Sequence, residues 1–162
     1  MTDDVNLQRL WVSLQKTSWK VLAVVSTTPE GSSLDVANAL ADVAWQFRGE
    51  STIVLDLRDL RLRLVDYQKA RIAEHRETHE NIVLALASID GNPASIALAR
   101  AADAVVLVVR LGETSAKSVE RAVAEIGREK IAGAIVAKRK PRPIMTASSA
   151  PTIVTPRAEA KT

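Results

Sequence analysis

The sequence predicts an α/β protein whose sheet is doubly wound and mostly parallel, with helices on both faces. Apolar stretches of strand length alternate with longer amphipathic stretches between residues 20 and 137. The intervening segments are long enough for the crossover helices that join parallel strands. Hydrophobic residues make up 47% of the chain and aromatic residues only 3%, so Ala, Val, Leu and Ile must build the core. This composition is typical of a parallel sheet that helices cover on both sides.

The first 19 residues are expected to form an N-terminal amphipathic helix. Its apolar residues recur at helical spacing, opposite a polar face that contains Arg9 and Lys16. These apolar residues are Leu7, Leu10, Trp11 and Leu14. Such a stripe packs either on the rest of the domain or on another protein. We therefore treat the four residues as candidates for partner binding, with packing inside the chain as the alternative.

Residues 20 to 137 are expected to form the α/β domain. The apolar stretches predict strands at residues 20–26, 52–56, 81–87, 103–110 and 131–137. Helices are expected at residues 33–46, about 65–76, 93–100 and 115–128. The first of these helices has Ser32 or Ser33 as its candidate N-cap and places Trp45 on its buried stripe. The last has Thr114 or Ser115 as its candidate N-cap.

The charge of the chain is divided unevenly between the domain and a C-terminal segment. The net charge is +3, but residues 138 to 162 carry +5 and residues 1 to 137 carry −2. Four of the six prolines also lie after residue 138, among Ala, Ser and Thr. This composition predicts a flexible basic tail. Basic charge that is confined to a tail argues against nucleic-acid binding by the domain.

Three absences in the sequence predict the compartment. The chain has no cysteine, which excludes disulfides and thiolate metal sites and fits a reducing cytoplasm. No apolar run approaches the roughly 20 residues that span a bilayer. The first residues carry acid where a signal peptide carries base. We therefore expect a soluble cytoplasmic protein without a transmembrane segment.

Residues 21 to 41 contain an apolar strand, a short turn and an amphipathic helix in succession. This order is typical of the first unit of a P-loop nucleotide-binding domain. A working loop has the pattern G-x-x-x-x-G-K-[ST], whereas the turn here is Pro29, Glu30, Gly31, Ser32 and Ser33. The lysine and the first glycine are missing. We interpret these five residues as a vestigial phosphate loop, in which a turn and a helix N-cap are favoured over phosphate binding.

Three blocks of the sequence together indicate a family. They are STTPEGSSLDVANALA at residues 26–41, TIVLDLRDLR at residues 52–61, and LARAADAVVLVVRLGETSAKSVERAVAEI at residues 98–126, followed by IAGAIVAK. Over about residues 20 to 138 the chain resembles the cytoplasmic bacterial tyrosine kinases of exopolysaccharide and capsule synthesis. These kinases are relatives of the MinD and ParA deviant-Walker ATPases. The resemblance implies a truncated domain of the P-loop NTPase type.

The resemblance also implies that the phosphate and magnesium ligands are largely lost. Ser32 stands where the family has the lysine that neutralises the β- and γ-phosphates, whereas Ser33 keeps the hydroxyl that holds magnesium. Asp56 matches the first acid of the second motif, but Arg58 stands at the position of the second. Asp59 serves only after a shift of one residue. Asp56 and Asp59 are therefore interpreted as a vestigial acidic motif.

Two further positions depart from the family. The segment that carries the Walker B aspartate there is Ala85, Leu86, Ala87 and Ser88 here, and Asp90 comes too late. Ala137 stands where the family has the asparagine that recognises adenine. Because phosphoryl transfer depends on positioning and charge neutralisation, these losses together favour a non-catalytic protein. We expect no catalytic residue, no bound cofactor and no metal ion.

The resemblance predicts a structural or regulatory subunit of bacterial exopolysaccharide synthesis and secretion. Its partner is expected to be a protein of a membrane-associated complex, such as an active kinase or ATPase relative. That partner would hold it at the inner face of the membrane, and self-association stays open. One alternative is a degenerate but active Mg-ATP-binding switch that uses Ser33, Asp56 or Asp59. Another is a MinD-like or ParA-like spatial-organisation protein that reaches the membrane by its N-terminal helix or basic tail.

Overall fold

The protein contains a single five-stranded sheet with the strand order β2-β3-β1-β4-β5. The computed structural model describes residues 4–29, 33–78 and 80–137. The strands are β1 (Val21–Ser26), β2 (Thr52–Asp56), β3 (Asn81–Leu86), β4 (Ala104–Arg110) and β5 (Ile131–Ala137). Every neighbouring pair is parallel. The predicted α/β class is therefore confirmed, with a Rossmann- or flavodoxin-like arrangement whose sheet is parallel throughout.

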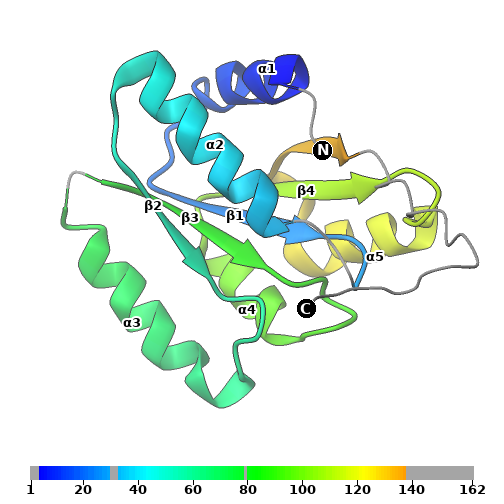
Figure 1. Ribbon diagram of the computed structural model, residues 1–162. Coiled ribbons are helices and arrows are strands. Elements are labelled where there is room, and N and C mark those ends of the chain that lie inside the picture. The colour runs from blue at the N-terminus through cyan, green and yellow to red at the C-terminus, as the bar shows by residue number, and fades with distance from the viewer. Residues whose placement is uncertain (1–3, 30–32, 79, 138–162) are drawn as a thin grey trace, which may run out of the picture.

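Helices cover both faces of this sheet, as predicted (Figure 1). One face carries α1 (Asp4–Leu14) and α2 (Ser33–Arg48). The other carries α3 (Val65–His75), α4 (Ala94–Ala101) and α5 (Ala116–Ile126). Two short 3-10 turns precede α3 and follow α5; they are η1 (Leu62–Leu64) and η2 (Arg128–Lys130). Among the described helices, none has the length and apolar content to cross a bilayer.

The central strand β1 is apolar from Val21 to Val25 because both of its faces are buried, and only its last residue, Ser26, is polar. Val21, Ala23 and Val25 face the α3–α5 side, whereas Leu22 and Val24 face the α1–α2 side. All five side chains have no exposed surface. This is the two-sided burial that makes a parallel strand a continuous apolar run.

The apolar stripe of α1 belongs to the core of the chain itself. Leu7, Leu10, Trp11 and Leu14 are 1–8% exposed and belong to the core cluster in which α1 packs with α2 and β5. Trp11 also meets Trp19 edge to face, with ring centroids 6.0 Å apart. These four side chains are therefore not on a surface that a partner can contact. The expectation of a partner-binding stripe is corrected to packing inside the domain, the alternative given above.

The buried stripe of α2 agrees with the expected one at Ala37, Leu40 and Ala44 only. Leu34 and Ala41, which we also expected there, are half-buried. The buried members of the stripe are Ser33, Val36, Ala37, Leu40, Val43 and Ala44. Trp45, which we expected on this stripe, is 64% exposed, and Phe47 is 55% exposed. Trp45 follows Ala44 by one residue and is therefore turned about 100° around the helix axis, away from the sheet.

Candidate functional site

The carboxyl edge of the sheet is the place where this fold forms ligand sites. In such sheets ligands bind outside the strand ends, where neighbouring connections leave toward opposite faces. β1 leads into α2 on one face, whereas its neighbours β3 and β4 lead into α4 and α5 on the other. The connections therefore diverge beyond the end of β1, and the vestigial phosphate loop begins there.

Two buried hydroxyls lie on either side of residues 30–32 in the chain, that of Thr28 just before Pro29 and that of Ser33 at the start of α2. Pro29 is exposed in a turn, Ser33 is the first residue of α2, and Glu30, Gly31 and Ser32 lie outside the described residues. The Oγ of Ser33 and the Oγ1 of Thr28 are buried and form no hydrogen bond with any described residue. Ser33 therefore does not cap α2 through its side chain. Both hydroxyls retain the capacity to donate to an anion or a water molecule.

The neighbouring hydroxyl, that of Thr27, is engaged within the protein. It donates to the carbonyl of Val108 at 2.6 Å, and its oxygen lies 3.0 Å from the Oγ1 of Thr114. Because Thr27 has a single proton, Thr114 must be the donor in the second contact. Thr114 in turn accepts from the backbone N–H of Arg110 at 2.8 Å. This chain of hydrogen bonds ties the end of β1 to the β4–α5 loop, and our sequence analysis missed it.

Asp56, at the end of β2, is held by an arginine two residues away. The guanidinium of Arg58 donates to both carboxylate oxygens of Asp56. The Nε–Oδ1 distance is 2.8 Å and the Nη2–Oδ2 distance is 2.9 Å. The backbone N–H of Arg58 adds a longer bond of 3.3 Å. The hydrogen bond from the Arg58 side chain is the main reason why the pKa of Asp56 lies below its ordinary value. In the same pair, the pKa of Arg58 is raised.

Two other carboxylates near this edge also form ion pairs with arginines. Asp90, in the β3–α4 loop, pairs with Arg121 at 2.6 Å, and Glu113, after β4, lies 3.7 Å from Arg110. Asp59 is exposed and forms no ion pair within the described residues. In the part of the chain that the structure covers, no three His, Cys, Asp or Glu side chains are grouped so as to hold a metal ion.

The register of the sheet brings two of the positions named by the resemblance side by side. Asp56 of β2 is the direct neighbour of Ala85 of β3. Ala85 is the residue that the resemblance places at the Walker B aspartate, and it is fully buried. At this level of the sheet, therefore, one strand presents an arginine-paired carboxylate and the next presents a methyl group. Ala137, the last residue of β5, pairs with Arg110 at the far side of the sheet.

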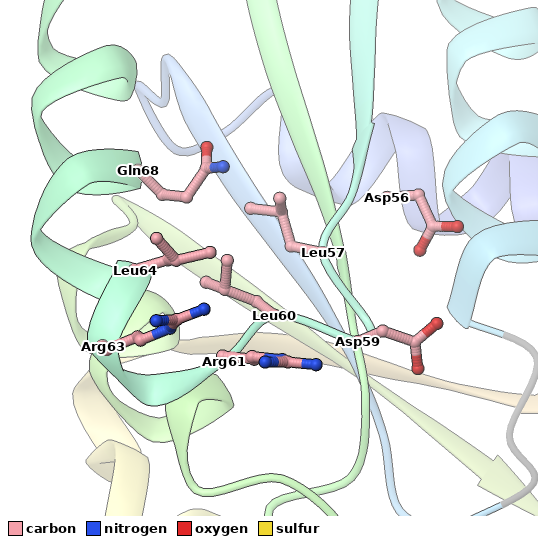
Figure 2. Close-up of a pocket in the computed structure, with 8 residues that line it drawn as sticks. All are labelled: Asp56, Leu57, Asp59, Leu60, Arg61, Arg63, Leu64 and Gln68. Carbon is pink, nitrogen blue, oxygen red and sulfur yellow. The ribbon is translucent and has the colours of Figure 1, made fainter.

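A shallow hollow of about 370 Å³ lies between the end of β2 and α3. Figure 2 shows the carboxylates of Asp56 and Asp59 at one side of it, with Leu57 and Leu60 in the middle and with Leu64 and Gln68 on the α3 side. Asn92, at the start of α4, fixes the loop that forms this hollow. Its amide donates to the carbonyls of Leu60 at 2.8 Å and Arg58 at 3.2 Å, and its oxygen accepts from the N–H of Ala94.

Comparisons with family models and with curated proteins identify no relative of this chain: no family model matches it, and no curated protein matches it. The fold and the contacts at the carboxyl edge are therefore the observations on which a function has to be argued.

Proposed function

We propose that this protein is a non-catalytic relative of the bacterial exopolysaccharide kinases, a pseudo-kinase or pseudo-ATPase that acts by binding other proteins. It serves as a structural or regulatory subunit in the synthesis and secretion of a polysaccharide such as capsule, a holdfast-like polymer or cellulose. Its partners belong to a membrane-associated complex, and an active kinase or ATPase relative is the partner that the resemblance favours. The protein works at the inner face of the membrane.

The observation that carries the proposal is the pairing of Asp56 with Arg58 beside Ala85. A magnesium site for phosphoryl transfer needs oxygen ligands that are free to meet the metal. The carboxylate of Asp56 already accepts two charge-assisted hydrogen bonds from Arg58. Its neighbour on β3, Ala85, has no ligand atom. A metal ion at this position would have to displace Arg58 from Asp56, and Asp56 would then be its one carboxylate ligand from this pair of strands.

The phosphate side of the site supports the same conclusion. Transfer of a phosphoryl group depends on cations that neutralise the developing charge. The loop sequence from Pro29 to Ser33 supplies no lysine or arginine, and its one acidic residue, Glu30, adds a negative charge. A helix N-terminus without such a cation attracts anions only weakly.

A second candidate, the Mg-ATP-binding switch, is favoured by the unpaired hydroxyls of Thr28 and Ser33. Thr28 follows the end of β1 and Ser33 begins α2, and both hydroxyls are buried without a partner among the described residues. Buried polar groups normally have a hydrogen-bond partner, so a phosphate oxygen at this point would satisfy them. A water molecule would do the same, and the experiment below separates a nucleotide from a water.

Calorimetric titration of the full chain with ATP and ADP, with and without magnesium, tests the proposal. A dissociation constant of about 1 mM corresponds to only about −4 kcal/mol, so the titration has to reach several millimolar nucleotide. The expected result is no binding heat in that range. Magnesium-dependent binding at micromolar concentration that is lost in Ser33→Ala and Asp56→Ala would overturn the proposal in favour of the switch.

The cellular role is tested by complementation of a strain from which the gene has been deleted. We expect that strain to lose or reduce its exopolysaccharide and to recover it fully with Asp56→Ala. A deletion strain with unchanged polysaccharide would contradict the assignment to this pathway. Failure of Asp56→Ala alone would instead point to the switch.

A further inference from the structure

We propose that the start of α3 is a docking surface for anionic lipid bilayers. The surface consists of Arg61, Leu62, Arg63, Leu64, Tyr67 and Arg71, which we call the η1–α3 tip. The proposal goes beyond the function above and does not rest on it, because it concerns lipid contact by the domain itself. It also differs from membrane contact by the N-terminal helix or the basic tail.

The η1–α3 tip exposes large apolar side chains outside any core. Leu62 is 66% exposed, Tyr67 is 60% exposed and Leu64 is 41% exposed. In the same segment the neighbouring Val65 and Ile72 are buried against the sheet. The segment is therefore held on the sheet by Val65 and Ile72, and the three exposed side chains form its outer surface. Clustered apolar side chains on a surface mark an interaction site.

The arginines of the tip differ from most arginines of the domain in having no carboxylate partner. Six arginines elsewhere form ion pairs, namely Arg48, Arg58, Arg76, Arg100, Arg110 and Arg121. Within the described residues, Arg61, Arg63 and Arg71 form none; Arg71 instead lies over the ring of Tyr67, 5.9 Å from its centroid. The exposed guanidinium groups of Arg61 and Arg63 are therefore available to lipid phosphates, which arginine binds well, whereas that of Arg71 lies over the tyrosine ring.

The charge of the domain is polarised toward this tip. Residues 56 to 71, which include the ion pair of Arg58 with Asp56, carry five basic and three acidic side chains, a net +2, whereas the rest of residues 1 to 137 carries −4. Such an asymmetry orients a protein with its positive side toward an anionic surface. The start of α3 also lies at the periphery of the molecule, on the opposite layer from α1 (Figure 1). The tip can therefore touch a flat surface without obstruction from α1.

The pattern favours a bilayer over an acidic protein segment. Leu62 and Leu64 alternate with Arg61 and Arg63, so each apolar side chain is flanked by a cation, as at membrane interfaces. Arg61, Arg63 and Leu64 of the tip also line the hollow, and Asp56 and Asp59 lie on its opposite side, so an acidic peptide that entered the hollow would meet both signs of charge (Figure 2). A bilayer meets the tip alone. Because one patch of this size gives marginal affinity, we expect reversible binding that salt weakens.

Flotation of the full-length protein with phosphatidylcholine vesicles, with and without phosphatidylglycerol, tests the proposal. We expect binding at low salt that requires the anionic lipid. With about 1 kcal/mol for each arginine near an anionic surface, the double variant Arg61→Gln, Arg63→Gln should lower the partition coefficient about thirtyfold. Leu62→Asn should lower it about tenfold through the loss of apolar contact.

Matched variants separate the tip from general charge and from the tail. Arg9→Gln with Arg128→Gln removes the same charge elsewhere, and Val12→Asn removes an apolar side chain that is 57% exposed on α1; both should bind as the wild type does. Neutralising Lys138, Arg139, Lys140 and Arg142 with glutamine should leave the effect of the tip variants intact. Thermal unfolding confirms that each variant is folded.

Two outcomes would overturn the proposal. One is the absence of binding to anionic vesicles at low salt, which would leave the tip to an acidic protein partner. The other is binding that persists in the Arg61, Arg63 and Leu62 variants and disappears with the tail charges. Either result is independent of the nucleotide titration, so failure of this inference is distinguishable from failure of the proposed function.

Discussion

Arg76 and Asp103 form a bidentate ion pair that joins the end of α3 to the start of β4. Two nitrogens of the guanidinium each donate to a different carboxylate oxygen at 3.0 Å. One of these oxygens also accepts from the backbone N–H groups of Lys20 and Val21 at 2.9 Å. The pair therefore connects three elements at the amino edge of the sheet, including the first residue of the central strand.

Replacement of Asp103 should destabilise the fold. Asp103→Ala removes four charge-assisted hydrogen bonds and leaves Arg76 without its carboxylate, so we expect the free energy of unfolding to fall by about 2 kcal/mol. This figure allows for solvent screening, because the two side chains are 34% and 28% exposed. Urea unfolding followed by circular dichroism measures it. As a control, Asp42→Ala, an exposed residue of α2, should have no effect.

The contribution of Asp103 should also depend on pH. Burial alone would raise its pKa, but the hydrogen bonds from Arg76, Val21 and Lys20 outweigh burial and hold the pKa below its ordinary value. The carboxylate therefore stabilises the protein fully above the unfolded pKa of about 3.9 and loses this effect as the pH falls through the folded pKa. The stability difference between wild type and Asp103→Asn should shrink below about pH 4. A difference that stayed constant there would contradict this explanation.

The pairing of Asp56 with Arg58 predicts a titration shift without a large change in stability. Arg58→Ala removes the side-chain hydrogen bonds that lower the pKa of Asp56, so that pKa should rise toward its ordinary value. Carboxylate NMR titration measures the pKa directly. Because the pair is solvent-exposed, the free energy of unfolding should change by less than about 1 kcal/mol. Arg61→Ala serves as the control and should leave the pKa of Asp56 where it is.

The fold could be predicted from the sequence because parallel strands leave a strong pattern. All five expected strands are present, and the apolar run of β4 (Ala104–Arg110) lies within one residue of its predicted bounds. The helix before β1 was predicted as well, but its packing partner was not. A hydrophobic stripe such as that of Leu7 and Trp11 has the same spacing whether it meets its own sheet or another chain.

The contacts of the candidate site were less accessible to sequence analysis because they join residues far apart in the chain. The sequence left Thr114 and Ser115 as candidates for the N-cap of α5. In the structure the N-cap is Ser115, whose Oγ accepts a hydrogen bond from the N–H of Ser118 at 3.1 Å. Thr114 instead contacts Thr27, 87 residues away. The same limit applies to Asn92, whose bonds to the β2–α3 loop span more than 30 residues.

The hydroxyl chain through Thr27 and Thr114 predicts a coupled pair of mutations. Thr27 is 5% exposed, so Thr27→Val should lower the free energy of unfolding by about 1–2 kcal/mol, because the Thr114 hydroxyl loses its acceptor. Thr114→Val should cost a similar amount, and the double variant less than the sum. Thr27→Ser keeps the hydroxyl and is the matched control. Strict additivity in the double-mutant cycle would show that the two hydroxyls do not interact.

Asn92 should be the main anchor of the loop between β2 and α3. Asn92→Ala removes its two amide bonds to Leu60 and Arg58 and its acceptor for Ala94, so we expect a loss of about 2 kcal/mol in unfolding free energy. Asn92→Asp keeps the acceptor but turns a carboxylate toward two carbonyl oxygens, and should be at least as destabilised. Amide hydrogen exchange should quicken selectively at residues 57–64. Asn38→Ala, at an exposed position of α2, is the control and should have wild-type stability. If Asn92→Asp also had wild-type stability, the hydrogen bonds of the Asn92 amide would not be what holds the loop.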